Sequence, residues 1–242
     1  MSKILFFRHA QASFLSDNYD QLSERGTLQS KELGKYLLDN EVYFDKIYVG
    51  PLVRQQKTQH IVADTFQNAG RSYESLRFPI QIEAMREHSG PEAMRSILPR
   101  WKEKDPKVAR MVQEMADEPS NKRKKSILMF QYFMKQWASG QVLDRSSDIE
   151  SWQDFRLRVR QGLNEVLSAT GKGQTVGVFT SGGTIAAIVA EAIGIQDEVK
   201  VANLNFVIRN TSITQFHFSE QELNLISFNE LPHLDKEMVT FV

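Results

Sequence analysis

One stretch decides the fold: Thr175-Val176-Gly177-Val178-Phe179-Thr180-Ser181-Gly182-Gly183-Thr184. Residues 175 to 180 have the apolar, β-branched and aromatic composition of a buried strand, and the glycines after them predict a tight turn. From Thr184 onward, apolar residues recur at helical spacing. A strand, a turn and a helix in direct succession indicate a sheet that is covered by helices.

Similar units occur earlier in the chain. A strand is predicted at residues 3 to 7 and another at 45 to 49, each followed by a helical pattern, and a weaker strand at 78 to 82. The helix after the first strand places Leu33, Tyr36 and Leu37 on one face, and the second helix covers 52 to 67. This alternation predicts an α/β fold with three αβα layers, in which a mainly parallel sheet is flanked by helices.

Three later segments complete the prediction. Residues 91 to 150 are charged and helical, so we expect a helical insertion there, broken at Pro99, at Pro106 and around 117 to 121. Ser151 resembles a helix N-cap, and the alternating runs 212 to 218 and 222 to 226 predict a hairpin. The 242 residues suffice for one large domain, so we expect a single domain, 1–242, with 91–150 as an insertion or cap within it.

Composition limits the classes of partner. Thirty basic residues balance thirty acidic ones, so net charge does not favour nucleic acid or an anionic membrane surface as a partner. There are no cysteines, which excludes disulfides and thiolate chemistry. No apolar run is long enough to span a membrane. We expect a cytoplasmic protein and leave its oligomeric state open, with a homodimer as one option.

Polar residues follow the predicted strands at the point where each strand ends. Arg8 and His9 follow the first strand, Arg54 the second, Glu87 the third, and Ser181-Gly182 the strand at 175 to 180. Because ligands bind at the carboxyl ends of parallel strands, we expect these residues to share one crevice.

These residue types suit a phosphate ester. Arginine guanidinium groups and the N-terminus of a helix bind phosphate oxygens, and Arg8, Arg54 and the turn at Gly182 supply them. A histidine such as His9 can attack phosphorus when it is neutral at the attacking nitrogen. The leaving alkoxide needs a proton, which Glu87 could donate.

Several motifs resemble those of the histidine phosphatase superfamily, whose fold is phosphoglycerate mutase-like. The run Arg8-His9-Ala10-Gln11-Ala12-Ser13 resembles its Arg-His-Gly or Arg-His-Ala signature. Further matches, in the order of the family, are Leu22-Ser23-Glu24-Arg25-Gly26 with Gln29, the run Gly50-Pro51-Leu52-Val53-Arg54 with Thr58, Met85-Arg86-Glu87, and Asn210-Thr211-Ser212-Ile213-Thr214. The resemblance covers both ends of the chain and leaves out residues 91 to 150.

The resemblance implies a phosphatase in which His9 carries the phosphoryl group and Glu87 donates the proton. Arg8, Arg54, Ser181 and Gly182 would hold the phosphoryl group, without a metal or cofactor. Ser13 and His88 are further candidates, Ser13 from the first motif and His88 because it adjoins Glu87. The substrate would be a small phosphorylated molecule or a phosphopeptide.

One position departs from the family pattern. Where the family usually has Ser-His-Gly-Gly, this chain has Thr180-Ser181-Gly182-Gly183, so Ser181 replaces the second active-site histidine. A serine keeps a hydroxyl donor but cannot carry positive charge, and loss of one such donor typically costs about 100- to 1,000-fold in rate.

Three alternatives therefore stay open. The first is phosphoglycerate mutase-type transfer, in which the phosphoryl group returns to a substrate hydroxyl. The second is a catalytically impaired phosphate-binding or scaffolding protein. The third, a plain nucleotide binder, ranks last because the chain has neither a phosphate loop with lysine nor a dinucleotide fingerprint.

Overall fold

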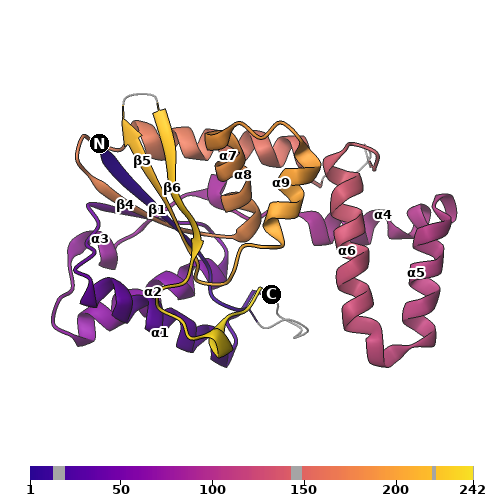
Figure 1. Cartoon of the computed structure of the whole chain (residues 1–242), viewed down its shortest axis with the longest axis horizontal. Coiled ribbons are helices and arrows are strands. Elements are labelled where there is room, and N and C mark those ends of the chain that lie inside the picture. Colours follow the sequence, from indigo (N-terminus) through magenta and orange to yellow (C-terminus); the bar gives the residue numbers. More distant parts are fainter. Residues whose placement is uncertain (13–19, 143–148, 220–221, 242) are drawn as a thin grey trace.

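The computed structural model describes residues 1–12, 20–142, 149–219 and 222–241 (Figure 1). Within these residues, six strands form one sheet in the order β3-β2-β4-β1-β5-β6. Their bounds are β1 Ser2–Arg8, β2 Lys46–Val49, β3 Ile80–Gln81, β4 Thr175–Thr180, β5 Ile213–Ser219 and β6 Glu222–Glu230. Strands β1 to β4 pair in parallel, and β5 and β6 add an antiparallel hairpin, so the sheet is mainly parallel as predicted.

Helices cover both faces of the sheet, which gives the three predicted layers (Figure 1). On one face lie α1 Glu24–Asp39, α2 Val53–Asn68 and α3 Glu74–Arg77; on the other lie α7 Trp152–Ser168, α8 Gly182–Ile193 and α9 Glu198–Asn205. The predicted N-cap Ser151 accepts a hydrogen bond from the Asp154 amide, and Ser23 caps α1 in the same way by accepting from the Gly26 amide.

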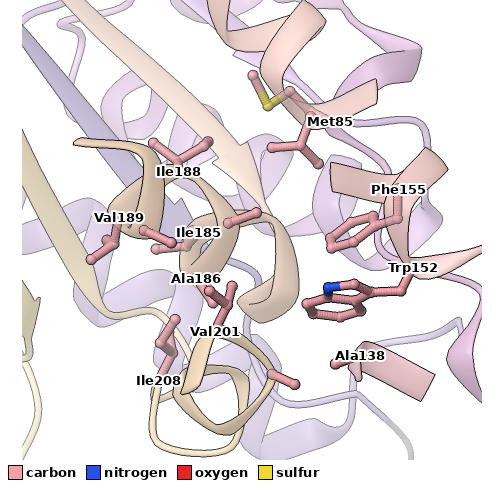
Figure 2. Packing of buried hydrophobic residues seen from close by; sticks show 14 of the residues in the cluster. Met85, Ala138, Trp152, Phe155, Ile185, Ala186, Ile188, Val189, Val201 and Ile208 are labelled. Atoms are coloured by element: carbon pink, nitrogen blue, oxygen red, sulfur yellow. The ribbon is translucent and has the colours of Figure 1, made fainter. Parts of the chain in front are cut away.

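The buried side chains form two clusters, one on each face of the sheet. Because side chains alternate along a strand, Leu5 and Phe7 of β1 face α1 and α2, while Ile4 and Phe6 face α8. The helix α8 is apolar almost all round and is buried between the sheet and α7. Figure 2 shows α8, which carries Ile185 and Ile188, beside Trp152 and Phe155 of α7. Burial on both sides fixes the strand ends from which the polar residues project.

Three helices form an arm that projects to one side of the sheet (Figure 1). We call this the helical arm: α4 Gly90–Lys104, α5 Pro106–Asp117 and α6 Lys122–Ala138. Its interior is aromatic, with Trp101 stacked on Tyr132 at 5.6 Å between ring centroids. The inner end of α6 reaches the rest of the molecule, where Phe130 contacts Phe206 and Trp137 contacts Trp152.

Two details differ from the sequence prediction. The third strand spans only Ile80–Gln81, because both side chains are exposed at the sheet edge and no buried face extends the pairing. Pro99 does not break the arm, since α4 continues through it to Lys104 with Ile97 and Trp101 buried around it. Pro106 does begin a new helix, whose N-cap is Asp105. In the described part of the chain, no helix is both long and apolar enough to cross a membrane.

Candidate active site

His9 lies directly after β1, in a backbone segment that three other elements hold. Its amide donates to the Thr180 carbonyl of β4 at 2.8 Å, and its own carbonyl accepts from Asn210 Nδ2 at 3.1 Å. The next amide, of Ala10, donates to Thr58 Oγ1 of α2 at 3.0 Å. Asn210 and Thr58 belong to the motifs recognised in the sequence, and here they fix the backbone that carries the histidine.

The His9 ring is buried and has a defined hydrogen-bond pattern. Nδ1 lies 2.7 Å from the Ala10 carbonyl, which can only accept, so Nδ1 carries the hydrogen. Nε2 accepts from Arg54 Nε at 3.2 Å and therefore presents a lone pair. Burial of the ring, reinforced by the charges of Arg54 and Arg8, lowers the pKa of His9 well below 6.5. At neutral pH the ring is uncharged, with Nε2 as its nucleophilic atom.

Arg54 is buried at the start of α2 and is oriented by Asp20. Its Nη1 donates to Asp20 Oδ1 at 2.8 Å, while its Nε points to His9. The same carboxylate accepts from the amides of Val53 and Arg54, so it also binds the N-terminus of α2. Asp20 thus couples the position of the guanidinium to the position of the helix.

Arg8 is buried at the end of β1. Its Nη1 donates to the carbonyl oxygens of Ile208 and Phe241, so the C-terminal segment lies against this guanidinium. A Cβ atom built on Gly182 would lie 3.4 Å from Arg8 Nε. Arg8 is therefore adjacent to the N-terminus of α8, as the sequence predicts.

Glu87 lies at the N-terminus of α8, where a phosphate oxygen was expected. Its Oε2 accepts from the Gly183 amide at 3.0 Å and its Oε1 from the His88 amide at 3.0 Å. Burial alone would raise the pKa of Glu87, but the His88 side chain, these two amides and Arg54 outweigh it and lower that pKa below 4.5. Without a ligand, the carboxyl group is ionised at neutral pH and accepts a hydrogen bond from the Gly183 amide at the N-terminus of α8.

Ser181 is fully buried at the N-cap position of α8. Its Oγ accepts from Gln55 Nε2 at 2.8 Å, which leaves the hydroxyl hydrogen as a donor. Gln55 is itself fully buried, and its amide oxygen accepts from the Leu52 amide. Position 181 therefore holds a neutral side chain that is tied to α2.

His88 is buried beside Glu87, with its Nε2 3.7 Å from Glu87 Oε1. Its Nδ1 accepts from the Gly90 amide at 3.1 Å, and its Nε2 lies 3.2 Å from Asn205 Nδ2. The ring is directed toward the helical arm and contacts aromatic side chains of α6 and α7.

The sequence was compared with models of known protein families. A family model described as "Histidine phosphatase superfamily (branch 1)" matches residues 120–231, which include β4 and α8. This match assigns the segment 120–231 to the histidine phosphatase superfamily. No curated protein matches the sequence significantly.

Solved structures with a similar fold cover nearly the whole chain, including the N-terminal strand and helices. A phosphoserine phosphatase mutant (H9A) from Entamoeba histolytica, in complex with phosphoserine, is 20% identical with a TM-score of 0.60, and covers 97% of this chain and 100% of that chain. A phosphoglycerate mutase from Bacillus anthracis str. Sterne is 16% identical with a TM-score of 0.62, and the match covers 96% of this chain and 94% of that chain.

An alpha-ribazole phosphatase from Shigella flexneri is 16% identical with a TM-score of 0.58, covering 94% of this chain and 96% of that chain. At these identities the likeness shows a shared fold and not a shared substrate. The predicted phosphoglycerate mutase-like fold is confirmed.

The structure brings most of the predicted histidine phosphatase residues together. Hydrogen bonds and close contacts link His9 to Arg54, Arg8 to Gly182, and Glu87 to His88 and Gly183. Ser13 lies outside the described residues. Among the described residues, no group of three or more His, Asp or Glu side chains is arranged to hold a metal ion.

The sequence patterns do not identify four residues that support the site: Asp20, Gln55, Arg158 and Asn205. Asp20 and Gln55 adjoin recognised motifs, and a polar residue next to a catalytic motif is a signal that could have drawn attention to them. Arg158 lies on α7 and donates to the carbonyls of Ala84 and Arg86, in the loop that carries Glu87. Nothing in its local sequence indicates that contact.

Proposed function

We propose that this protein is a phosphomonoester phosphatase that forms a phosphohistidine intermediate on His9. The observation that carries the proposal is the state of the His9 ring, in which Nδ1–H is bound to the Ala10 carbonyl and the lone pair of Nε2 lies beside Arg54 Nε. A histidine that attacks phosphorus needs this tautomer, a neutral ring and a nearby cation for the phosphoryl oxygens.

The reaction proceeds in two steps. Nε2 of His9 forms a bond to phosphorus, the bond from phosphorus to the ester oxygen breaks, and the leaving alkoxide takes a proton from Glu87. Water then attacks the phosphohistidine, gives a proton to Glu87, and releases phosphate with a free His9. Arg8, Arg54, the hydroxyl of Ser181 and the helix terminus at Gly182 hold the phosphoryl oxygens throughout.

Ligand binding must first rearrange the charges of the site. Glu87 is ionised without a ligand, and a phosphate dianion placed beside it would raise its pKa by repulsion, so that it takes up the proton it later donates. The phosphate oxygens would replace His9 as acceptors of the Arg54 Nε–H. The donors that the ester needs are already assembled around His9, which limits the reorganisation to short movements.

The substrate class is a small phosphorylated molecule or a phosphopeptide. Solved structures with this fold contain phosphoserine or 3-phosphoglyceric acid, which supports a compact phosphomonoester. The division into one domain, 1–242, with 91–150 as a helical insertion stays a prediction, as do a cytoplasmic location and the absence of nucleic acid and membrane partners.

A second candidate function is a phosphate-binding or scaffolding protein with little turnover. Ser181 favours it, because the position of the second histidine holds a neutral hydroxyl whose oxygen is engaged by Gln55. Arg8 and Arg54 would still bind an anion there.

A panel of phosphomonoesters distinguishes the two functions. Wild-type protein, His9→Ala and Ser181→His would be incubated with p-nitrophenyl phosphate, phosphoserine and 3-phosphoglycerate, with free phosphate and phosphoryl transfer both measured. The phosphatase proposal expects phosphate release by wild type, none by His9→Ala, and faster release by Ser181→His. Thermal stabilisation by these esters without turnover in wild type would select the binding protein instead.

A further inference from the structure

The side chain of His88 is enclosed by four aromatic rings. We call them the aromatic box: Phe130 and Trp137 of α6, and Trp152 and Phe155 of α7. Their centroids lie between 5.4 and 6.4 Å from that of His88, with Phe155 and Trp137 presenting an edge-to-face geometry. Figure 2 shows Trp152 and Phe155 side by side next to α8. The box fixes the plane of the imidazole.

His88 also touches the beginning of the helical arm. Its Nδ1 accepts from the amide of Gly90, the first residue of α4, while the box includes two residues of α6. The Gly90 amide can only donate, so Nδ1 is the acceptor of this hydrogen bond. The histidine is therefore in contact with the first and last helices of the arm.

On its other side, His88 packs against the proposed proton donor. Nε2 lies 3.7 Å from Glu87 Oε1, the closest approach of the imidazole to that carboxylate among the polar contacts described. Both side chains lie over Gly183, where an added Cβ would come within 2.3 Å of Glu87 Oε1 and 2.6 Å of His88 Cδ2. The carboxylate is thus confined between the helix terminus and the imidazole.

The backbone of Glu87 is held independently of His88. Arg158 donates to the carbonyl oxygens of Ala84 and Arg86 at 2.9 Å, and Thr184 Oγ1 donates to the latter at 3.1 Å. These bonds fix the main chain but leave the carboxylate to rotate about its side-chain bonds. The groups that limit this rotation are the amides of Gly183 and His88, which hold one carboxylate oxygen each, and the His88 ring beside them.

We propose that His88 is a positioning residue for the leaving-group proton donor: it orients the Glu87 carboxylate and links the helical arm to the proton-transfer step. This inference rests on the proposed function. A general acid acts only within hydrogen-bond reach of the leaving oxygen, and a displacement of about 1 Å can cost 100-fold in rate. A shift of the arm on substrate binding would move His88, and with it Glu87.

The test compares two leaving groups on the same protein sample. p-Nitrophenolate is a stable anion and departs without a proton, whereas the serine alkoxide of phosphoserine needs one. The values of kcat/KM report every step up to departure of the leaving group. Their ratio does not depend on the fraction of folded protein, so a variant that is partly unfolded still gives an answer.

Two substitutions separate the functions of the ring. His88→Phe keeps an aromatic ring in the box but removes both nitrogens, and His88→Asn keeps an acceptor for the Gly90 amide but removes the atom that faces Glu87. We expect both variants to reduce kcat/KM about 10- to 100-fold for phosphoserine and less than about threefold for p-nitrophenyl phosphate. The matched control His60→Gln changes an exposed histidine of α2 and should leave both values unchanged.

Two further variants complete the experiment. Glu87→Gln should show the same selective loss, and adding His88→Phe to it should cost little more, because the positioned group is already gone. Phe130→Leu, which loosens the box from the arm, should give a smaller loss on phosphoserine alone. Equal losses of His88→Phe and His88→Asn on both substrates would overturn the inference and leave the phosphatase intact. No turnover by wild type on either substrate would overturn the proposed function and the inference together.

Discussion

The two halves of the site are built in different ways. The nucleophile half consists of His9, Arg8, Arg54 and Asp20, and its catalytic ring is fixed by its own neighbour Ala10 and by α2. The acid half consists of Glu87, His88, Ser181 and Gly183, and its carboxylate is fixed by α8 and, through His88, by residues of α6 and α7.

This difference concerns readiness for the reaction. The nucleophile half already has the charge state that attack requires, because burial and two arginines keep His9 neutral. The acid half has the opposite state from the one it needs, since Glu87 is ionised and bound to the helix amide. A bound ligand must therefore change the charge state of the acid half, to which Ser181 also belongs.

The largest effect is expected at Arg54. Arg54→Ala removes the cation beside Nε2 and should reduce kcat/KM for p-nitrophenyl phosphate about 1,000-fold, or about 4 kcal/mol of transition-state stabilisation. Arg54→Lys keeps a charge without the planar fork and should recover part of the loss. Steady-state kinetics measures both, with the exposed Arg160→Ala as control. A loss below tenfold for Arg54→Ala would break the distinction between the halves.

The next effect concerns the support of the acid half. Arg158 pairs with Glu150 through two bonds of 2.6 and 2.8 Å, and both side chains are largely buried. Arg158→Met leaves the Glu150 carboxylate without its cation and removes the donor to the carbonyls of the Glu87 loop. The free energy of unfolding, measured in urea, should therefore fall by about 2–4 kcal/mol. The double variant Arg158→Met with Glu150→Gln should recover part of it. Unchanged stability would mean that the ion pair does not hold the loop.

A smaller effect separates the two tasks of Asp20. Asp20 binds the N-terminus of α2 from outside the helix, so Asp20→Asn keeps one acceptor oxygen for the amides of Val53 and Arg54 while losing the ion pair with Arg54. We expect kcat/KM to fall about tenfold, or about 1.4 kcal/mol, with little change in stability. Asp20→Ala should lose about 1 kcal/mol of folding free energy in addition. Equal activity of wild type and Asp20→Asn would show that Arg54 is oriented without its partner.

The smallest effect is a pH dependence in the support of the nucleophile half. His233 lies 2.9 Å from Thr211 Oγ1, and Thr211 donates its amide to the Arg8 carbonyl. Burial lowers the pKa of His233 to about 4 from 6.5. The unfolded chain therefore binds this proton first, so its contribution to stability is present above pH 6.5 and is lost as the pH falls toward 4.

Replacing His233 should make the free energy of unfolding depend less on pH below pH 7. Between pH 7 and pH 5, His233→Asn should lose about 2 kcal/mol less folding free energy than wild type, as measured by urea unfolding at each pH. His217→Asn, which changes another histidine of the C-terminal part, serves as the control. Identical profiles for wild type and His233→Asn would contradict the assignment.

Local signals account for the parts of the molecule that the sequence predicted well. Arg8, His9 and Arg54 follow short apolar strands, and the carboxyl ends of parallel strands meet at one edge whatever the details of packing. The predicted N-cap Ser151 depends only on residues within one turn. Such features are determined by residues that are close together in the sequence.

Long-range contacts account for the parts that the sequence did not predict. The occupation of the Gly183 amide by Glu87 joins residues 96 positions apart, and the aromatic box brings α6 and α7 to a single histidine. The continuation of α4 through Pro99 likewise depends on burial of Trp101 within the arm. No periodicity or motif carries this information, because tertiary packing decides it.

Detection of the phosphoryl group on His9 tests the central claim most directly. Wild-type protein turning over p-nitrophenyl phosphate would be denatured in alkali, where phosphohistidine is stable, then digested and analysed by mass spectrometry. The predicted result is a phosphoryl group on the peptide containing His9, lost in acid and absent from His9→Ala. Phosphate release by His9→Ala at the wild-type rate, or a phosphoryl group on another residue, would contradict it.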